Sequence, residues 1–211
     1  MLYRVTVYLL GMFINFFGVA LVIHATLGAG FWTSFFIGIS DIFGMTVGFW
    51  YGVFQFIIIF LNARLMNQRP EFQALIPVIL ESFILDFWLE IVFSSFNLAA
   101  APMVVKAITL GAGMTAIGLG VAVYILPQFP RAPVDQLFLA VSARFNLSLR
   151  MGQTLVAIVV ASLAVLIGGP VGVGTGVLVI ALGPVIQFWY TRAYRIYYAL
   201  KPENVPQEEY L

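Results

Sequence analysis

The chain has 211 residues, of which 62% are hydrophobic and only 9% are charged, and its net charge is +1. A soluble domain carries roughly 25% charged residues and has too small an interior to hide so much apolar surface, so the composition excludes a soluble protein and predicts a lipid bilayer as the partner. The small net charge excludes nucleic acid as a partner, because there is no basic excess to neutralise phosphates.

Six apolar segments are predicted to cross the membrane as helices, because their lengths approach the roughly 20 residues that a bilayer requires. In chain order they are residues 3–23, 46–62, 72–93, 103–125, 150–166 and 174–194. Two further helices are predicted at 31–43 and 133–145. Each is only about 20 Å long, too short to span, and is predicted to be re-entrant or interfacial. The predicted fold class is an all-α polytopic membrane protein.

The two halves of the chain repeat one another. The stretch GVALVI at 18–23 returns as GVAVYI at 120–125, and the order of long spans and short helices also recurs. We interpret this as a duplication, with a first repeat at 1–96, a second at 97–198 and a disordered cytoplasmic tail at 199–211. The matched pairs include Gly11 with Gly113, Gly18 with Gly120, Phe36 with Phe138 and Ser40 with Ser142.

Three spans in each half is an odd number, so the second half must enter the membrane from the opposite side. This arrangement is an inverted-topology repeat. If Arg4 is cytoplasmic, every Lys and Arg except Lys106 falls on the cytoplasmic side, as the positive-inside rule requires. The charges therefore predict that both termini are cytoplasmic and that the short helices do not span.

Three longer patterns carry a family resemblance. They are GVALVI followed by LGAGFWT at 18–33, NQRPEF followed by DFWL at 67–89, and GGPVGVGT followed by GPVIQ at 168–187. They resemble the YczE/YitT group of bacterial membrane proteins, which implies a multi-pass protein of the bacterial cytoplasmic membrane and no particular activity. The Pro and Asp that this group carries early in each short helix match Pro133 and Asp135, whereas the first half has Phe31 and Thr33 there.

Acidic residues inside a span are the first candidates for function, because charge is costly in lipid. The third predicted span holds Glu81 near its middle and, nearer its outer end, Asp86 and Glu90. Glu81 is predicted either to line a polar cavity and take up a proton or cation, or to be paired or neutral. Asp86 is predicted to join such a site or to make a structural hydrogen bond to a neighbouring helix, and Glu90 to lie at the interface.

Proline and glycine within the spans predict helix interruptions. Pro77 lies in the third span, and Gly183 and Pro184 lie at the matching depth of the sixth span. Interrupted helices at corresponding places in inverted halves indicate a binding site near the membrane midplane. The alternative is that each proline makes only a packing kink.

The beginnings of the two short helices form a second candidate site. Thr33 and Asp135 occupy equivalent positions and are predicted to be N-cap residues. The exposed N–H groups of a helix N-terminus attract anions, and Arg131 would help to bind one. Simple helix capping is the alternative interpretation.

The inverted architecture predicts a small secondary transporter of an unidentified solute, proton-coupled through Glu81. The alternative is a non-transporting membrane partner that supports an enzyme or complex in the bilayer. No catalytic set, metal site or cofactor motif is found in the sequence, so we expect no enzyme activity, no metal and no cofactor. A small-residue helix face, Ala112, Ala116 and Gly120, predicts close helix packing and a homodimer.

Overall fold

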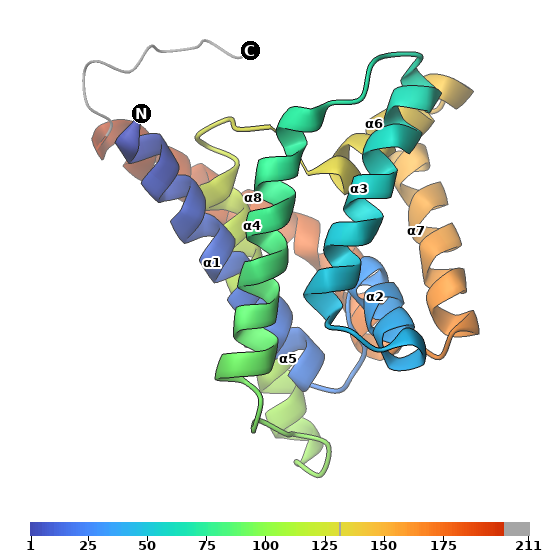
Figure 1. The fold of residues 1–211 in the computed structure, drawn as a ribbon. Coiled ribbons are helices and arrows are strands. Elements are labelled where there is room, and N and C mark those ends of the chain that lie inside the picture. The colour runs from blue at the N-terminus through green and yellow to red at the C-terminus, as the bar shows by residue number, and fades with distance from the viewer. Residues whose placement is uncertain (131, 201–211) are drawn as a thin grey trace.

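The computed structural model describes residues 1–130 and 132–200, and this part of the chain is helical without any strand. The all-α prediction is therefore confirmed, and the two short helices have the predicted bounds. The elements are α1 (Leu2–His24), α2 (Phe31–Phe43), α3 (Val47–Met66), the 3-10 helix η1 (Phe72–Ala74), α4 (Leu75–Asp86), the π-helix η2 (Phe87–Val92), α5 (Met103–Tyr124), α6 (Pro133–Phe145), α7 (Leu149–Leu166) and α8 (Val173–Leu200) (Figure 1).

Local sequence explains where several helices begin and end. The side chain of Thr46 accepts a hydrogen bond from the Phe49 N–H at the start of α3, and Ser148 caps α7 in the same way. Pro133 opens α6, where its missing N–H costs nothing. Asn67 and Asn146 adopt left-handed backbone conformations that end α3 and α6.

The chain is a multi-pass membrane protein. Within the described residues, five helices (α1, α3, α5, α7 and α8) are long and apolar enough to cross a bilayer. Their outer surfaces expose large apolar side chains, such as Phe56 and Phe60 of α3 and Val179 and Ile180 of α8, as lipid contact requires. The predicted third span is helical from Phe72 to Val92, but it changes type twice along its length.

The predicted interruption of the sixth span is wrong. Helix α8 continues unbroken through Pro184 and reaches Leu200, beyond the predicted end at 194. A break in lipid would expose further backbone groups, so one lost hydrogen bond at a proline costs less than ending the helix. The helix includes residues 199 and 200, which were predicted as tail, and 201–211 lie outside the described residues. Pro77 lies in the first turn of α4, where proline is well tolerated.

Glycines allow α1 and α5 to cross in close, antiparallel contact (Figure 1). A Cβ atom added at Gly18 would lie 2.6 Å from the carbonyl oxygen of Gly113, and one at Gly11 would lie 2.9 Å from that of Gly120. No side chain fits at these positions, as is usual where membrane helices pack closely. Gly120 is therefore occupied by the contact with α1, whereas Ala112 of the same predicted small-residue face is exposed.

Each short helix packs against both halves of the chain. Helix α2 packs on α3 of its own half and on α7 of the other, and α6 packs on α7 and on α3. The two short helices lie at opposite ends of the molecule, α2 toward the bottom and α6 toward the top of Figure 1. We call the contact of α2 with the α7–α8 turn the α2 junction, and the contact of α6 with the α3–α4 turn the α6 junction.

The α2 junction is closed by direct hydrogen bonds. The Ala29 N–H donates to the carbonyl of Pro170 (2.9 Å), and the Thr175 hydroxyl donates to the carbonyl of Ala29 (2.6 Å). Gly28, at φ +108°, lies against Gly172 so closely that an added Cβ would be 2.5 Å from its nitrogen. Two turns rich in glycine can therefore interlock backbone to backbone.

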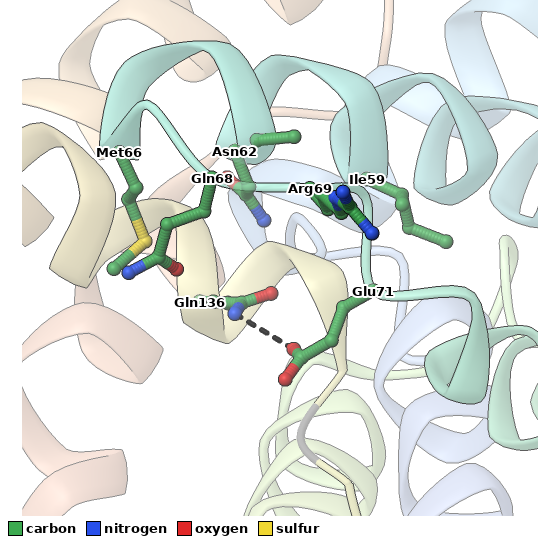
Figure 2. Close-up of a pocket in the computed structure, with 8 residues that line it drawn as sticks. Ile59, Asn62, Met66, Gln68, Arg69, Glu71 and Gln136 are labelled. Atoms are coloured by element: carbon green, nitrogen blue, oxygen red, sulfur yellow. Dashed lines mark hydrogen bonds between the residues drawn. The ribbon is translucent and has the colours of Figure 1, made fainter.

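The α6 junction is more open. The Asn62 side-chain amide donates to the carbonyl of Pro133, and the Gln136 amide donates to the carboxylate of Glu71, both at 2.8 Å. A pocket of about 70 Å³ lies between these groups (Figure 2).

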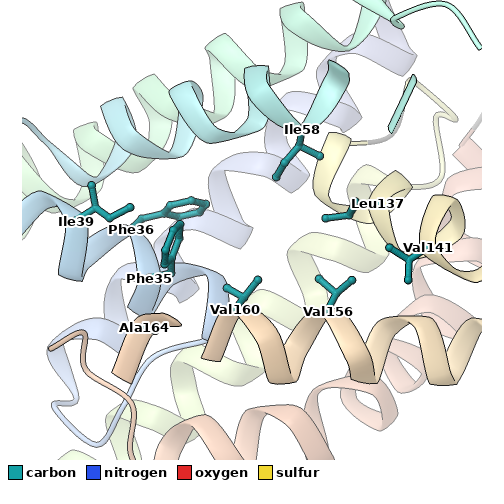
Figure 3. Packing of buried hydrophobic residues seen from close by; sticks show 9 residues of the cluster. All are labelled: Phe35, Phe36, Ile39, Ile58, Leu137, Val141, Val156, Val160 and Ala164. Carbon is teal, nitrogen blue, oxygen red and sulfur yellow. The ribbon is translucent and has the colours of Figure 1, made fainter. Parts of the chain in front are cut away.

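A hydrophobic core joins the two short helices to the long helices beside them (Figure 3). Its side chains come from both halves of the chain, which ties the halves together through burial of apolar surface. They are Phe35, Phe36 and Ile39 of α2, Ile58 of α3, Leu137 and Val141 of α6, and Val156, Val160 and Ala164 of α7.

Candidate functional site: a buried carboxyl between α3, α4 and α6

Glu81 of α4 is the only Asp or Glu among the described residues that is fully buried, with 4% of its surface exposed. The Tyr51 hydroxyl donates to its Oε2 at 2.6 Å, and the Gln55 amide donates to the same oxygen at 3.3 Å. Tyr51 and Gln55 are four residues apart on α3 and so share one helix face. The carboxyl is therefore held by α3.

Gln55 connects this carboxyl to the beginning of α6. Its side-chain oxygen accepts a hydrogen bond from the Val134 N–H at 3.1 Å, while its amide donates to Glu81. Gln55 has no exposed surface, so both ends of its amide are satisfied inside the protein. A movement of α6 relative to α3 would thus be transmitted to Glu81 through one side chain.

The two carboxyl oxygens of Glu81 are not used equally. Among the described residues, no hydrogen bond reaches Oε1, and both donors converge on Oε2. Tyr8 of α1 and Tyr124 of α5 lie within electrostatic range of the carboxyl. A buried carboxyl with a free oxygen can accept a proton or coordinate a cation, and burial favours whichever state is neutralised.

Asp86 is hydrogen-bonded to a neighbouring helix, which is one of the two roles predicted for it. Its Oδ2 accepts a hydrogen bond from the Thr46 hydroxyl (2.5 Å), and its Oδ1 accepts one from the Gly48 N–H (2.7 Å). Both donors belong to the start of α3, where the N-terminal N–H groups favour a negative charge. Asp86 therefore fastens α4 to α3. Glu90 is exposed in η2.

The prediction that Thr33 and Asp135 are N-cap residues is wrong. The N-caps are Gly30 for α2 and Ala132 for α6, without a side-chain cap in either case, so Thr33 and Asp135 lie in the first turns. Both helices begin at the predicted residues, Phe31 and Pro133, so the N-cap is the residue just before each of them, and in α6 Pro133 fixes the first helical φ angle. Asp135 is exposed and within electrostatic range of Glu81. Arg131 lies outside the described residues.

Gly183 and Pro184, predicted to mark a midplane site at the depth of Glu81, do not face that carboxyl. Both residues are exposed on α8, and a Cβ atom added at Gly183 would meet nothing within 4 Å. The hydrogen-bond partners of Glu81 come instead from α3. Sequence reasoning missed Tyr51 and Gln55, although a Gln within the apolar run GVFQFIIIF was a signal that could have identified Gln55.

Comparison with known proteins identifies relatives. The model of the Family of unknown function (DUF6198) matches residues 2–191. "Uncharacterized protein YyaS" of Bacillus subtilis (strain 168) is 31% identical, over 83% of this chain and 86% of its own length. "Uncharacterized membrane protein YczE" of the same organism is 27% identical, over 88% and 84% of the two chains. No solved structure matches the chain.

Proposed function

Because this chain belongs to the Family of unknown function (DUF6198) and is similar to the membrane protein YczE, as its sequence patterns predict, we propose its function from the site itself. The proposed function is that of a small secondary transporter, which couples the movement of a small solute to protonation of Glu81. The proposal assigns the chain no catalytic activity.

The burial of Glu81 carries this proposal. A charged residue near the centre of a membrane helix costs about 2.5–3.5 kcal/mol on insertion scales, and such residues usually serve ion or proton pathways. An apolar side chain would avoid that insertion cost, although Tyr51 and Gln55 would then lose their acceptor. The carboxyl keeps one oxygen free of hydrogen bonds from the described residues, which suits a group that binds and releases a proton.

The packing supports two inverted repeats, the architecture of many alternating-access transporters. In the contact, Gly11 meets Gly120 and Gly18 meets Gly113. The predicted duplication matches the same four glycines, but Gly11 with Gly113 and Gly18 with Gly120. The short helices also exchange places in a matching way, since α2 packs on α7 while α6 packs on α3. Rocking of one half against the other would move α6, and Gln55 would relay that movement to Glu81.

The positions of the chain ends support a sixth crossing. The Tyr3 hydroxyl donates to the carbonyl of Tyr197 at 2.9 Å, so the beginning of α1 and the end of α8 lie together. Five crossings would place these ends on opposite faces of the membrane. The segment from Phe72 to Val92 supplies the additional crossing, because its helices together are roughly 30 Å long.

Cysteine labelling tests this topology, because the natural chain has no Cys. We expect Ser95→Cys and Leu166→Cys, both at exposed positions, to react in intact cells with a membrane-impermeant maleimide. Gln68→Cys, at the opposite end of the molecule, should react only after the cells are opened. Labelling of Gln68→Cys in intact cells would contradict the inverted arrangement.

Solute uptake tests the function. Purified protein is reconstituted into liposomes that contain a pH-sensitive dye, and a panel of small sugars, amino acids, amines and organic anions is added outside. We expect one chemical class to change the internal pH in the presence of the protein and not in empty liposomes. If correctly folded protein moves neither protons nor any member of the panel, the non-transporting membrane partner becomes the better assignment.

A further inference from the structure

The pocket at the α6 junction is a site separate from Glu81. It lies between the last turns of α3, the α3–α4 turn and the first turn of α6, and Figure 2 shows Asn62 between Gln68 and Arg69, with Glu71 and Gln136 opposite. A single water needs about 10–15 Å³ by a comparable measure, so the volume of about 70 Å³ accommodates a solute of roughly five non-hydrogen atoms.

Asn62, one of the residues that line this pocket, carries an unsatisfied acceptor. Only 3% of Asn62 is exposed, and its amide nitrogen is used by the carbonyl of Pro133. Its Oδ1 is buried and has no hydrogen-bond partner in the part of the chain that the structure describes. A buried acceptor without a partner is costly, so the position favours a ligand that brings an N–H or O–H donor.

The pocket also holds two opposite charges that do not neutralise each other. Arg69 forms no ion pair within residues 1–130 and 132–200, and the hydrogen-bond partner of Glu71 is the neutral amide of Gln136. A guanidinium is well suited to bind a carboxylate through two parallel hydrogen bonds. Glu71 and the Asn62 oxygen are acceptors, which suits an ammonium group.

We propose that this pocket binds a small zwitterion, an amino carboxylate of about the size of glycine. Its carboxylate binds Arg69, and its ammonium group donates to Asn62 Oδ1 and to Glu71. The α2 junction shows that a contact between a short helix and a turn does not require such a pocket, because direct bonds from Ala29 and Thr175 close it. The site stands whether or not Glu81 carries protons.

Equilibrium binding of radiolabelled glycine to the purified full chain in detergent tests the proposal. We expect saturable binding that Arg69→Gln and Glu71→Gln each weaken about tenfold or more, because each variant removes one charged partner. Arg64→Gln is the matched control, because Arg64 is exposed like Arg69 and lies nearby, on the last turns of α3, but does not line the pocket. This variant should change the affinity for glycine less than twofold.

The half-ligands acetate and methylamine separate a zwitterion site from a simple charge site. Each should compete with glycine about tenfold more weakly than unlabelled glycine does. Absence of saturable glycine binding, equal competition by acetate, or full binding by Arg69→Gln would overturn the proposal. Glu81→Gln should bind glycine normally, and its failure to do so would place the solute at Glu81 instead.

Discussion

Gly120→Ala is expected to lower the free energy of unfolding by about 1–3 kcal/mol, the usual cost of overpacking. A Cβ atom at Gly120 would collide with the backbone of Asn15 and would lie 2.7 Å from the carbonyl oxygen of Gly11. Backbone atoms cannot turn aside as a flexible side chain can, so α1 and α5 must separate along their whole crossing. Gly18→Ala should have the same effect, because its Cβ atom would lie 2.5 Å from the nitrogen of Ile117.

Gly111→Ala is the matched control on the same helix. A Cβ atom at Gly111 would meet nothing within 4 Å, so this variant should gain about 0.5–1 kcal/mol from the better helix propensity of alanine. Thermal unfolding in detergent, followed by the fluorescence of the four Trp residues, measures the difference. Equal midpoints for Gly120→Ala and Gly111→Ala would mean that the α1–α5 contact is looser than the structure has it.

Glu81→Gln is expected to abolish proton coupling while leaving the fold intact. Glutamine keeps the shape of the side chain and one oxygen that can accept the hydrogen bond from Tyr51, but it cannot take up a proton near neutral pH. In the liposome assay, the proposed solute-driven change of internal pH should disappear. The midpoint of thermal unfolding should stay within a few degrees of the parent value.

Asp86→Asn provides a carboxyl control on the same helix. Asp86 holds the start of α3 through Thr46 and Gly48, so this change should lower the unfolding temperature and leave proton coupling in place. Glu81→Leu should also lower it, because the buried polar groups of Tyr51 and Gln55 would lose their acceptor. If Glu81→Gln keeps full pH dependence, Glu81 serves only as a structural hydrogen-bond acceptor.

The short helices could be predicted to the residue because strong local signals flank them. Gly44, with φ +73°, ends α2, and Pro133 begins α6. The long helices are equally visible, since an apolar run of the right length has few alternatives in lipid. The changes of helix type around α4 were not predicted, because hydropathy does not distinguish an α-helix from a π-helix.

The candidate site was only half predictable. The burial of Glu81 follows from its depth in an apolar segment, but its partners depend on which helices are neighbours in space. Hydropathy carries no such information, so Gly183 and Pro184 were chosen by symmetry, whereas Tyr51 and Gln55 hold the carboxyl. The glycines that match between the two halves lie together at the α1–α5 contact, whereas symmetry misled where one half carries polar side chains that the other lacks.

The exchange of short helices between the halves also governs how the protein is made. Helix α2 leaves the ribosome early, but α7, against which Phe35 and Phe36 pack, is synthesised only near the end of translation. Until then the newly made first half holds an apolar helix without its main partner. We expect a chain that ends before α7 to keep that surface unpaired and to be degraded by membrane proteases. The packing of α2 on α7 would then distinguish a finished chain from an unfinished one.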